Sequence, residues 1–390
     1  MADKGKFTAQ DAASLRGYEF PEEKVGYNTR DVLIYNLGVG ATEPAFTFEG
    51  DPAFQGPLPT FPLCLVHKRS SLDIVPFSTG EMLPPALSKV PQTAIVHGEQ
   101  WIELLKPLPI SSMEGLVHRT KVVDLEDKWF RPALATFSWP ATGLVRVDGI
   151  FVVRSGALIS LETHLVEKSS GEILAKHLSK VFLKGMGGFS EQRQQPPTAL
   201  KRDTVPHGER MPSKFSVWLL GWQKVIGRRA GEVRVELSTL DVQAQLYRLS
   251  GDYNALHVDE AFARRVGFPR PVLHGLATLG FAARAVIRAL GDNIAASLKA
   301  IGGRFAAPVL PGDTLLVSMW PAAGDESKQL ARAEGELEST DRVYEFEVRV
   351  KGRTGPMAIV ISRGKAVLGQ AARPCRRTTS RAPGELLARL

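Results

Sequence analysis

The sequence predicts an α+β fold made of two domain-sized units, and three observations support that prediction. The chain has 390 residues, which is enough for two domains that each bury a core. A polar, proline-bearing segment at residues 187–213 has no sustained periodicity and divides the chain into halves. Residues 271–290 have the apolar spacing of a helix, and strand-like segments follow them. A helix packed against several strands is the pattern of an α+β domain.

The first half is predicted to end in a β-hairpin. Residues 158–167 and 173–183 have the composition of strands. The segment Lys168-Ser-Ser-Gly-Glu172 between them is a turn signal. Two antiparallel strands are therefore expected before the central linker.

The second half is predicted to contain one long helix followed by strands. Within residues 271–290 apolar side chains recur at helical spacing, while Arg284 and Arg288 fall on the opposite side. Pro271 suits an early helical position, and Gly291 suits the residue past the helix end. The later segments with strand alternation or composition are 298–305, 314–320, 330–338 and 344–351.

Composition and charge exclude several classes of protein. Apolar residues make up 44% and charged residues 23%, as in ordinary globular proteins. Two cysteines are too few for a disulfide framework and indicate a reducing compartment. Every long apolar run is broken by proline, glycine or charge, so we expect no membrane span and no secretory signal.

The net charge of +8 is uneven, because the last twenty residues hold five arginines and one glutamate. The rest of the chain has no basic stripe interleaved with aromatic residues. Nucleic acid is therefore not an expected partner.

The densest chemical signal is Asp252-x-Asn254-x-x-His257, between a strand-like run and the long helix. Gly251 and Asn254 favour a turn, so the three side chains can converge on one cavity. A carboxylate and an imidazole within reach of one water form an acid–base pair. The same residues also fit an Asx-turn and helix cap with a surface histidine, and spacing alone favours this structural alternative.

The surrounding residues favour the chemical interpretation. The stretch YRLSGDYNALHVDEAFARRVGFPRPVLHGLATLGF resembles the signature of MaoC-like (R)-specific 2-enoyl-CoA hydratases (hydratase 2), including the hydratase part of peroxisomal multifunctional enzymes. Ala255 departs from the pattern, since the family commonly has proline there. Further blocks that resemble the family lie at residues 35–41, 96–109 and 299–312.

The resemblance implies a double hot-dog fold, with two hot-dog units in one chain. It implies an acyl-CoA-binding unit at residues 1–192, a linker and insertion at 193–235, a catalytic unit at 236–369 and a flexible basic tail at 370–390. In the family's eukaryotic members the central helix of the first unit is reduced, which leaves room for a bulky acyl chain. The proline-rich stretch 57–91 predicts the same reduction here.

The resemblance also implies an activity, the hydration of trans-2-enoyl-CoA to (3R)-3-hydroxyacyl-CoA in fatty-acid β-oxidation. Water adds at C3 and charge develops on the thioester oxygen, so the enzyme needs an activated water, a proton source for C2 and an oxyanion donor.

By resemblance, Asp252 and His257 hold the water and exchange its protons, and either residue can be the formal base. Asn254 orients the site. The N–H of Gly275 forms the oxyanion hole, which suits a first-turn N–H at the positive end of a helix. A structural alternative for Gly275 is that it lets helix and sheet pack closely.

Four further residues match substrate-contacting positions of the family. His97 and Gly98 match a ligand-contacting pair, Lys128 matches a lysine that contacts CoA, and Phe305 matches an aromatic beside the bound nucleotide. Three of them also have an ordinary structural interpretation, His97 as a hydrogen-bonded histidine, Lys128 as a solvated lysine and Phe305 as a core aromatic.

No metal and no other cofactor is expected. Cys64 and Cys375 are far apart in the sequence, and the pair Cys64–His67 supplies only two ligands. The chain has no Gly-rich nucleotide fingerprint of the dehydrogenase type.

The chain ends in Ala388-Arg389-Leu390, a conservative variant of the Ser-Lys-Leu peroxisomal address. With the resemblance, this ending predicts a peroxisomal import receptor as a partner and the peroxisome as the location, with the cytoplasm as the alternative. The other expected partners are an acyl-CoA thioester and, by resemblance, a second copy of the chain in a homodimer.

Three other functions remain open. A MaoC-type dehydratase or hydratase of polyketide or other secondary metabolism would use the same residues on a different acyl chain. A hot-dog thioesterase would release CoA. A non-catalytic acyl-CoA binder is disfavoured, because Asp252, Asn254 and His257 are all present.

Overall fold

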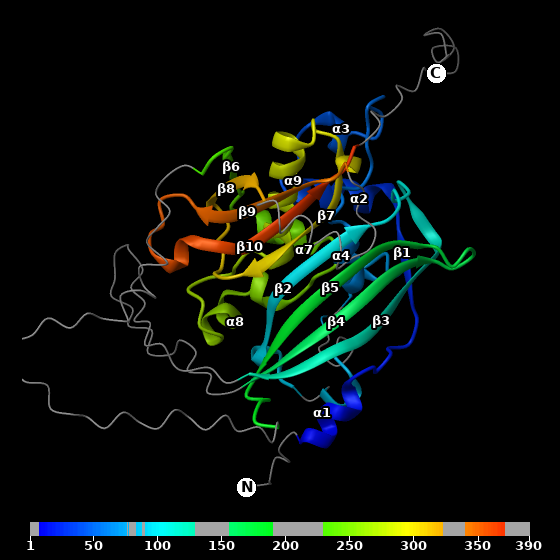
Figure 1. The fold of residues 1–390 in the computed structure, drawn as a ribbon, viewed down its shortest axis with the longest axis vertical. Coiled ribbons are helices and arrows are strands. Elements are labelled where there is room, and N and C mark those ends of the chain that lie inside the picture. The colour runs from blue at the N-terminus through cyan, green and yellow to red at the C-terminus, as the bar shows by residue number, and fades with distance from the viewer. Residues whose placement is uncertain are drawn as a thin grey trace, which may run out of the picture.

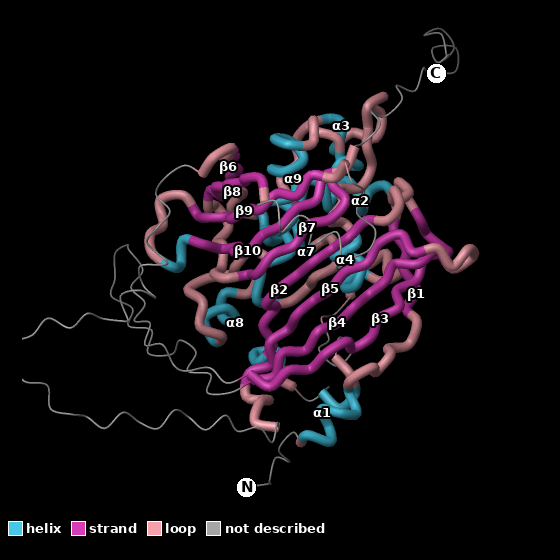
Figure 2. Tube along the Cα trace, viewed as in Figure 1, coloured by secondary structure: helices cyan, strands magenta, loops and turns pink. Residues whose placement is uncertain are grey.

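The computed structural model describes residues 8–75, 77, 83–87, 90–128, 156–189, 229–322 and 340–370. Within them, one antiparallel sheet of ten strands has the order β1-β3-β4-β5-β2-β7-β10-β9-β8-β6. Figure 1 shows this sheet crossing the molecule, with α4, α7 and α9 behind it in that view. The coloured tube of Figure 2 shows the strands as one layer. This is the α+β double hot-dog architecture that the sequence predicted.

The first half of the chain supplies one half of the sheet. The hairpin predicted at residues 158–183 is confirmed, since β4 pairs with β5 in antiparallel register. β2 then joins the two halves by pairing with β7, from Glu99 opposite Arg304 to Glu103 opposite Ala300. The strands are β1 (Glu23–Tyr27), β2 (Ile95–Leu104), β3 (Ser112–Lys128), β4 (Gly156–Glu167) and β5 (Ile173–Lys184).

The second half of the chain supplies the other half of the sheet. The predictions at 298–305, 314–320 and 344–351 are confirmed, and 330–338 lies outside the described residues. One strand, β6, begins before the predicted unit boundary at 236, in the stretch assigned to the linker. The strands are β6 (Val233–Ser238), β7 (Leu298–Phe305), β8 (Thr314–Pro321), β9 (Arg342–Val350) and β10 (Ile359–Leu368).

The predicted long helix is α9 (Gly275–Leu290), which packs against β6, β7, β8 and β10. Its start differs from the prediction, which placed Pro271 near the first turn. The chain stays extended before Gly275 because Leu273 N–H donates to Val309 O and Val272 O accepts from His257. The predicted end is confirmed, since Gly291 is the C-cap.

Arg284 corrects the expectation of a charged outer face on α9. Its residue surface is only 4% exposed, and its guanidinium pairs with Glu43 at 2.5 Å and lies 4.6 Å from the ring of Phe46. The charge is buried because a carboxylate from the first half of the chain compensates it. Arg288 is exposed, as expected.

The described part of the first half has only short helices. The longest is α2, with ten residues, and within 57–91 the only described α-helix is α4, with seven. The predicted reduction of the first central helix agrees with this. The helices are α1 (Ala9–Leu15), α2 (Thr29–Gly38), α3 (Pro44–Thr47) and α4 (Pro62–Lys68), followed in the second half by α7 (Gln243–Arg248) and α8 (Glu260–Arg265). None of the described helices is long and apolar enough to cross a membrane.

Candidate active site

The turn that carries Asp252 is pressed against the end of α4. Gly251 has a φ of +130°, and a Cβ built on it would lie 2.7 Å from the backbone nitrogen of Lys68. Both the conformation and the close approach require glycine. The turn after α7 therefore lies directly against the last turn of α4, which carries His67.

The structure contains the Asx-turn and helix cap that were the structural alternative for Asn254. The histidine that was expected on the surface in that alternative is instead buried. Asp252 Oδ1 accepts from the Asn254 N–H at 3.2 Å, and Asn254 Oδ1 accepts from the Leu256 N–H at 3.0 Å, which caps the 3₁₀ turn Ala255–His257. His257 is only 8% exposed. The Asx-turn thus aims the histidine inward.

The tautomer of His257 follows from its contact with the backbone. Its Nδ1 lies 2.7 Å from Val272 O, an acceptor only, so Nδ1 carries the proton and donates it. The Nε2 atom then retains its lone pair. A fixed imidazole with a basic nitrogen is the arrangement that general base catalysis requires.

His274 is a site residue that the sequence analysis missed. Its ring stacks on that of His257, with centroids 3.5 Å apart and planes at 21°. Its Nε2 lies 3.1 Å from the backbone oxygen of Asp252. The only sequence signal was its place directly before Gly275 in the family-like block.

The electrostatics favour an ionised Asp252 beside a neutral His257. Burial raises the pKa of Asp252, but the imidazoles of His67, His274 and His257 and the Asn254 N–H lower it, and the net pKa falls below its ordinary value. Burial lowers the pKa of His257, although Asp252 and the Val272 hydrogen bond oppose this. At neutral pH the pair offers a carboxylate and a lone pair.

Four predicted site residues from both halves of the chain meet beside this pair. A Cβ on Gly275 would lie 3.4 Å from the ring of Phe305, which meets His97 edge-on with centroids 5.1 Å apart. Gly98 forms a bulge in β2, where a Cβ would lie 3.2 Å from Lys180 O. Burial lowers the pKa of His97 to about 4.

Lys128 is the one predicted residue whose backbone alone is described. It ends β3 opposite Gly156, at the same end of the sheet as His97. Since β4 and β5 lie between β3 and β2, and Lys128 is three residues out of level with His97 along the strands, the two backbones are roughly 18 Å apart.

Three described side chains offer atoms that a metal ion could use. The ligand atoms of Asp252, His257 and His274 all lie within 4.8 Å of one another. One nitrogen of each imidazole, however, contacts a backbone oxygen, His257 Nδ1 with Val272 and His274 Nε2 with Asp252, and an oxygen that only accepts needs an N–H there. The geometry fits proton transfer better than metal binding.

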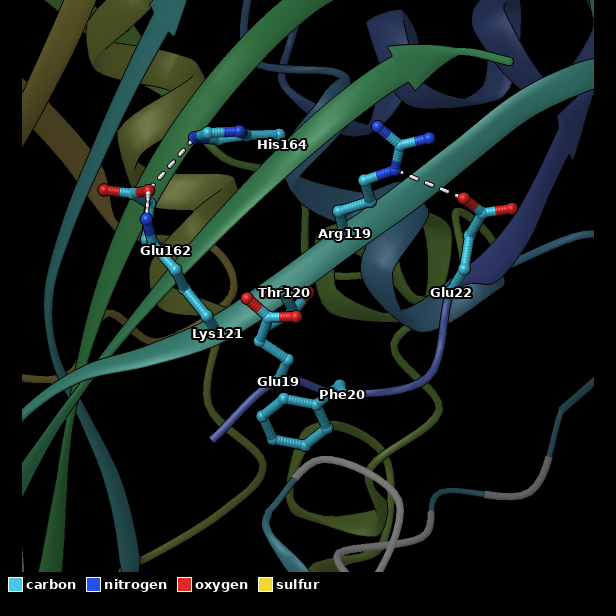
Figure 3. Close-up of a pocket in the computed structure, with 8 residues that line it drawn as sticks. All are labelled: Glu19, Phe20, Glu22, Arg119, Thr120, Lys121, Glu162 and His164. Carbon is cyan, nitrogen blue, oxygen red and sulfur yellow. Dashed lines mark hydrogen bonds and ion pairs between the residues drawn. The ribbon is translucent and has the colours of Figure 1, made fainter. Parts of the chain in front are cut away.

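A separate polar pocket of about 410 Å³ lies at the β1 edge of the sheet (Figure 3). Most of its charged groups are paired, with Arg119 on Glu22 and both Lys121 and His164 on Glu162. None of its lining residues belongs to the Asp252 cluster, and its internal ion pairs leave it no evident chemical task.

Comparison with protein families gives two matches. Residues 26–136 match the MFE-2 hydratase 2 N-terminal domain, and residues 223–343 match the MaoC like domain.

Among relatives, the chain is 32% identical to the peroxisomal enoyl-CoA hydratase 2 of Arabidopsis thaliana, over 90% of this chain and 94% of that protein. It is also 32% identical to 3-hydroxyacyl-thioester dehydratase Y of Mycobacterium tuberculosis, over 75% and 82%. It is 32% identical to the peroxisomal multifunctional enzyme type 2 of Mus musculus, where it covers 78% of this chain but 34% of the longer enzyme.

Solved structures agree with these relatives. A MaoC-like dehydratase from Phytophthora capsici superposes with a TM-score of 0.65 at 30% identity, covering 92% of this chain and 97% of that one. The full-length peroxisomal multifunctional enzyme type 2 of Drosophila melanogaster gives 0.54 at 28% identity, covering 89% and 48%.

Proposed function

Since the chain belongs to the MaoC-like enoyl-CoA hydratase 2 family, we propose that it hydrates trans-2-enoyl-CoA to (3R)-3-hydroxyacyl-CoA in fatty-acid β-oxidation. The observation that carries this proposal is that the side-chain ligand atoms of Asp252 and His257 lie within 4.8 Å of each other, while Val272 O holds the proton of His257 on Nδ1. Gly275 directly follows His274, whose ring stacks on that of His257, and its N–H belongs to a first helical turn, where it has no intrahelical acceptor.

In the proposed reaction the water lies between the Asp252 carboxylate and His257 Nε2. One of these groups takes a proton from the water while its oxygen bonds to C3. The π electrons move through C2 and C1 to the thioester oxygen, which the Gly275 N–H stabilises. C2 then takes a proton from the pair, so the net reaction adds one water and consumes no other reagent.

The remaining family positions are proposed to bind the substrate. His97 and Gly98 on β2 and Phe305 on β7 come from different halves of the chain, and Phe305 lies against both His97 and Gly275. Lys128 is proposed to meet a phosphate of CoA, by resemblance alone. Asn254 is proposed to hold the turn, since its side chain caps the residues leading to His257.

The test is turnover of crotonyl-CoA and trans-2-decenoyl-CoA with chiral analysis of the product. We expect loss of the conjugated double bond and a (3R)-alcohol. Release of free CoA would instead identify a thioesterase, and binding without turnover would identify a non-catalytic binder. Dehydration of the (3R)-alcohol is also expected, because a catalyst accelerates both directions.

We also propose that the protein acts in peroxisomes, as the names of several relatives state for those proteins. Deleting Ala388-Arg389-Leu390 should move a fluorescent fusion to the cytosol. A truncated fusion that still reaches peroxisomes would contradict the predicted receptor signal. Homodimerisation, proposed by resemblance, is measured by light scattering on the purified chain.

A further inference from the structure

A band of polar side chains crosses the inner face of the first unit's sheet. Cross-strand partners share a face, and His177, Thr163 and Thr120 are successive partners on β5, β4 and β3. His177 is also the partner of Ile102, which belongs to the same buried cluster as α9, so this face is the helix-covered one. The polar band comprises Gln100, Ser179, His177, Thr163, Thr120 and His118.

The polar band separates two hydrophobic clusters. On one side lies the large cluster, which includes Leu116, Leu165 and Ala175. On the other lies a smaller cluster, which includes Val122, Ile159 and Leu183. These cluster residues all lie on β3, β4 and β5, so the polar band interrupts an apolar sheet face over three successive cross-strand levels, those of Ser179, His177 and His118.

Two members of the polar band are costly to bury. His118 is 2% exposed and His177 is 4% exposed, with ring centroids 6.2 Å apart. Neither ring nitrogen of either residue has a hydrogen-bond partner in the part of the chain that the structure describes. A buried polar group without a partner costs about 1–3 kcal/mol, so these groups call for a function.

The polar band is continuous with the candidate active site. Gln100 lies on β2 close to His97, whose ring meets Phe305 and whose Nε2 is buried with no hydrogen-bond partner among the described residues. Because of the bulge at Gly98, His97 pairs with Val181 and Gln100 pairs with Ser179, two residues apart on β5. His97 and Gln100 therefore lie on the same face of the sheet.

Of the two units, only the first offers an inner sheet face that no long helix fills in its described part, so the acyl chain of the proposed substrate should lie there. In the second unit the inner face is filled by α9, nearly all of whose residues are buried. In the described part of the first unit no helix exceeds ten residues. From the thioester site a long chain therefore extends over the first unit's inner face, toward the polar band.

We propose that the polar band is a subsite for an acyl chain that carries a hydroxyl group, so that the enzyme favours hydroxylated long-chain enoyl-CoA. This inference rests on the proposed hydratase function. Two imidazoles 6.2 Å apart can both contact one hydroxyl oxygen placed between them, one as donor and one as acceptor.

The charge state of the imidazoles favours a hydroxyl over a carboxylate. Burial lowers the pKa of His118 to about 3, and burial together with His118 lowers that of His177 well below its ordinary value. Both rings are therefore neutral at pH 7, and each offers one N–H and one lone pair. A carboxylate would enter this buried place without a compensating cation, which is strongly unfavourable.

The register gives the position of the hydroxyl. His97 pairs with Val181, and His177 lies four residues further along β5, which is roughly 13 Å. An extended chain advances roughly 1.2 Å per bond, so the carbon that bears the hydroxyl should lie about ten or eleven bonds from the thioester carbon. An ω-hydroxyl on a twelve-carbon acyl chain matches this distance.

The experiment compares kcat/KM for 12-hydroxy-trans-2-dodecenoyl-CoA and trans-2-dodecenoyl-CoA. We expect about a tenfold preference for the hydroxylated substrate, the value of one net hydrogen bond. The dicarboxylic analogue, with a carboxylate at the same end, should be the poorest of the three. In His177→Leu and His118→Leu the preference should fall to about one, while His177→Asn, which retains a donor and an acceptor, should keep part of it.

The control variant is His164→Leu, on β4 but on the opposite face of the sheet, which should keep the full preference. A wild-type ratio at or below one would overturn the proposal, and so would an unchanged ratio in both leucine variants, since internal water would then account for the imidazoles. Turnover of trans-2-decenoyl-CoA, too short to place a group in the polar band, tests the hydratase function separately.

Discussion

The two hot-dog units bury the same face of one sheet by different means. The second unit covers it with α9, whose buried side chains are almost all apolar. The first unit covers it with short helices and retains the polar band between two apolar clusters. The helix that fills the second unit also begins at Gly275, so its packing fixes the proposed oxyanion donor. The difference indicates a rigid unit for chemistry and a more adaptable unit for the acyl chain.

The largest expected effect concerns the acid–base pair. Asp252→Ala and His257→Ala should each reduce turnover of trans-2-decenoyl-CoA by roughly a hundred- to ten-thousandfold, because each group exchanges protons in the transition state. Circular dichroism should remain native. His164→Leu, on the outer face of the first unit's sheet, is the matched control, and it should retain turnover of this substrate. Near-normal rates in either alanine variant would show that the assigned mechanism is wrong.

The next effect is on stability and compares packing in the two units. Leu279→Ala removes a fully buried side chain from α9, and we expect a loss of about 2–5 kcal/mol in the free energy of unfolding. Leu87→Ala removes a buried leucine from a short 3₁₀ turn of the first unit. For Leu87→Ala the loss in the free energy of unfolding should lie near the lower end of that range, since a short turn can move into the cavity that the leucine leaves. Equal losses in urea unfolding would remove this distinction between the units.

The pH dependence of stability should be traced in part to the polar band, beside the buried active-site imidazoles of His97, His257 and His274. The pKa values of His118 and His177 are lowered in the folded protein, so below about pH 6.5 the unfolded chain binds protons that the folded chain does not. The free energy of unfolding should therefore fall as the pH falls from 6.5 toward 3. The slope is about 1.4 kcal/mol per pH unit for each imidazole. The double variant His118→Leu/His177→Leu should flatten this slope, measured by urea unfolding between pH 7 and 4. An unchanged slope would mean that the two rings are hydrated.

Local sequence patterns predicted the strands and the Asp252–His257 turn because alternation and turn chemistry are local properties. They misplaced the start of α9, since a tertiary hydrogen bond from Leu273 to Val309 holds the preceding residues extended. They placed Arg284 on an outer face because its partner, Glu43, comes from the other half of the chain. His274, His67 and the polar band depend on register between distant segments, which a single sequence does not display.

The smallest expected effect concerns the ion pair that links the two units. Arg284 on α9 is buried, but the Glu43 side chain is 30% exposed, so solvent screens part of the attraction. Glu43→Gln should therefore cost only about 1 kcal/mol in the free energy of unfolding, and Arg288→Ala, an exposed change on the same helix, should cost nothing measurable. In the Glu43→Gln background, Arg284→Met should change the free energy of unfolding little, because the guanidinium that it removes no longer has a charged partner. A double-mutant cycle by thermal unfolding measures this coupling. Zero coupling would mean that the ion pair does not stabilise the contact between the units. The β2–β7 pairing and the Gln55 hydrogen bonds to Asn293 and Ala295 would then hold the units together.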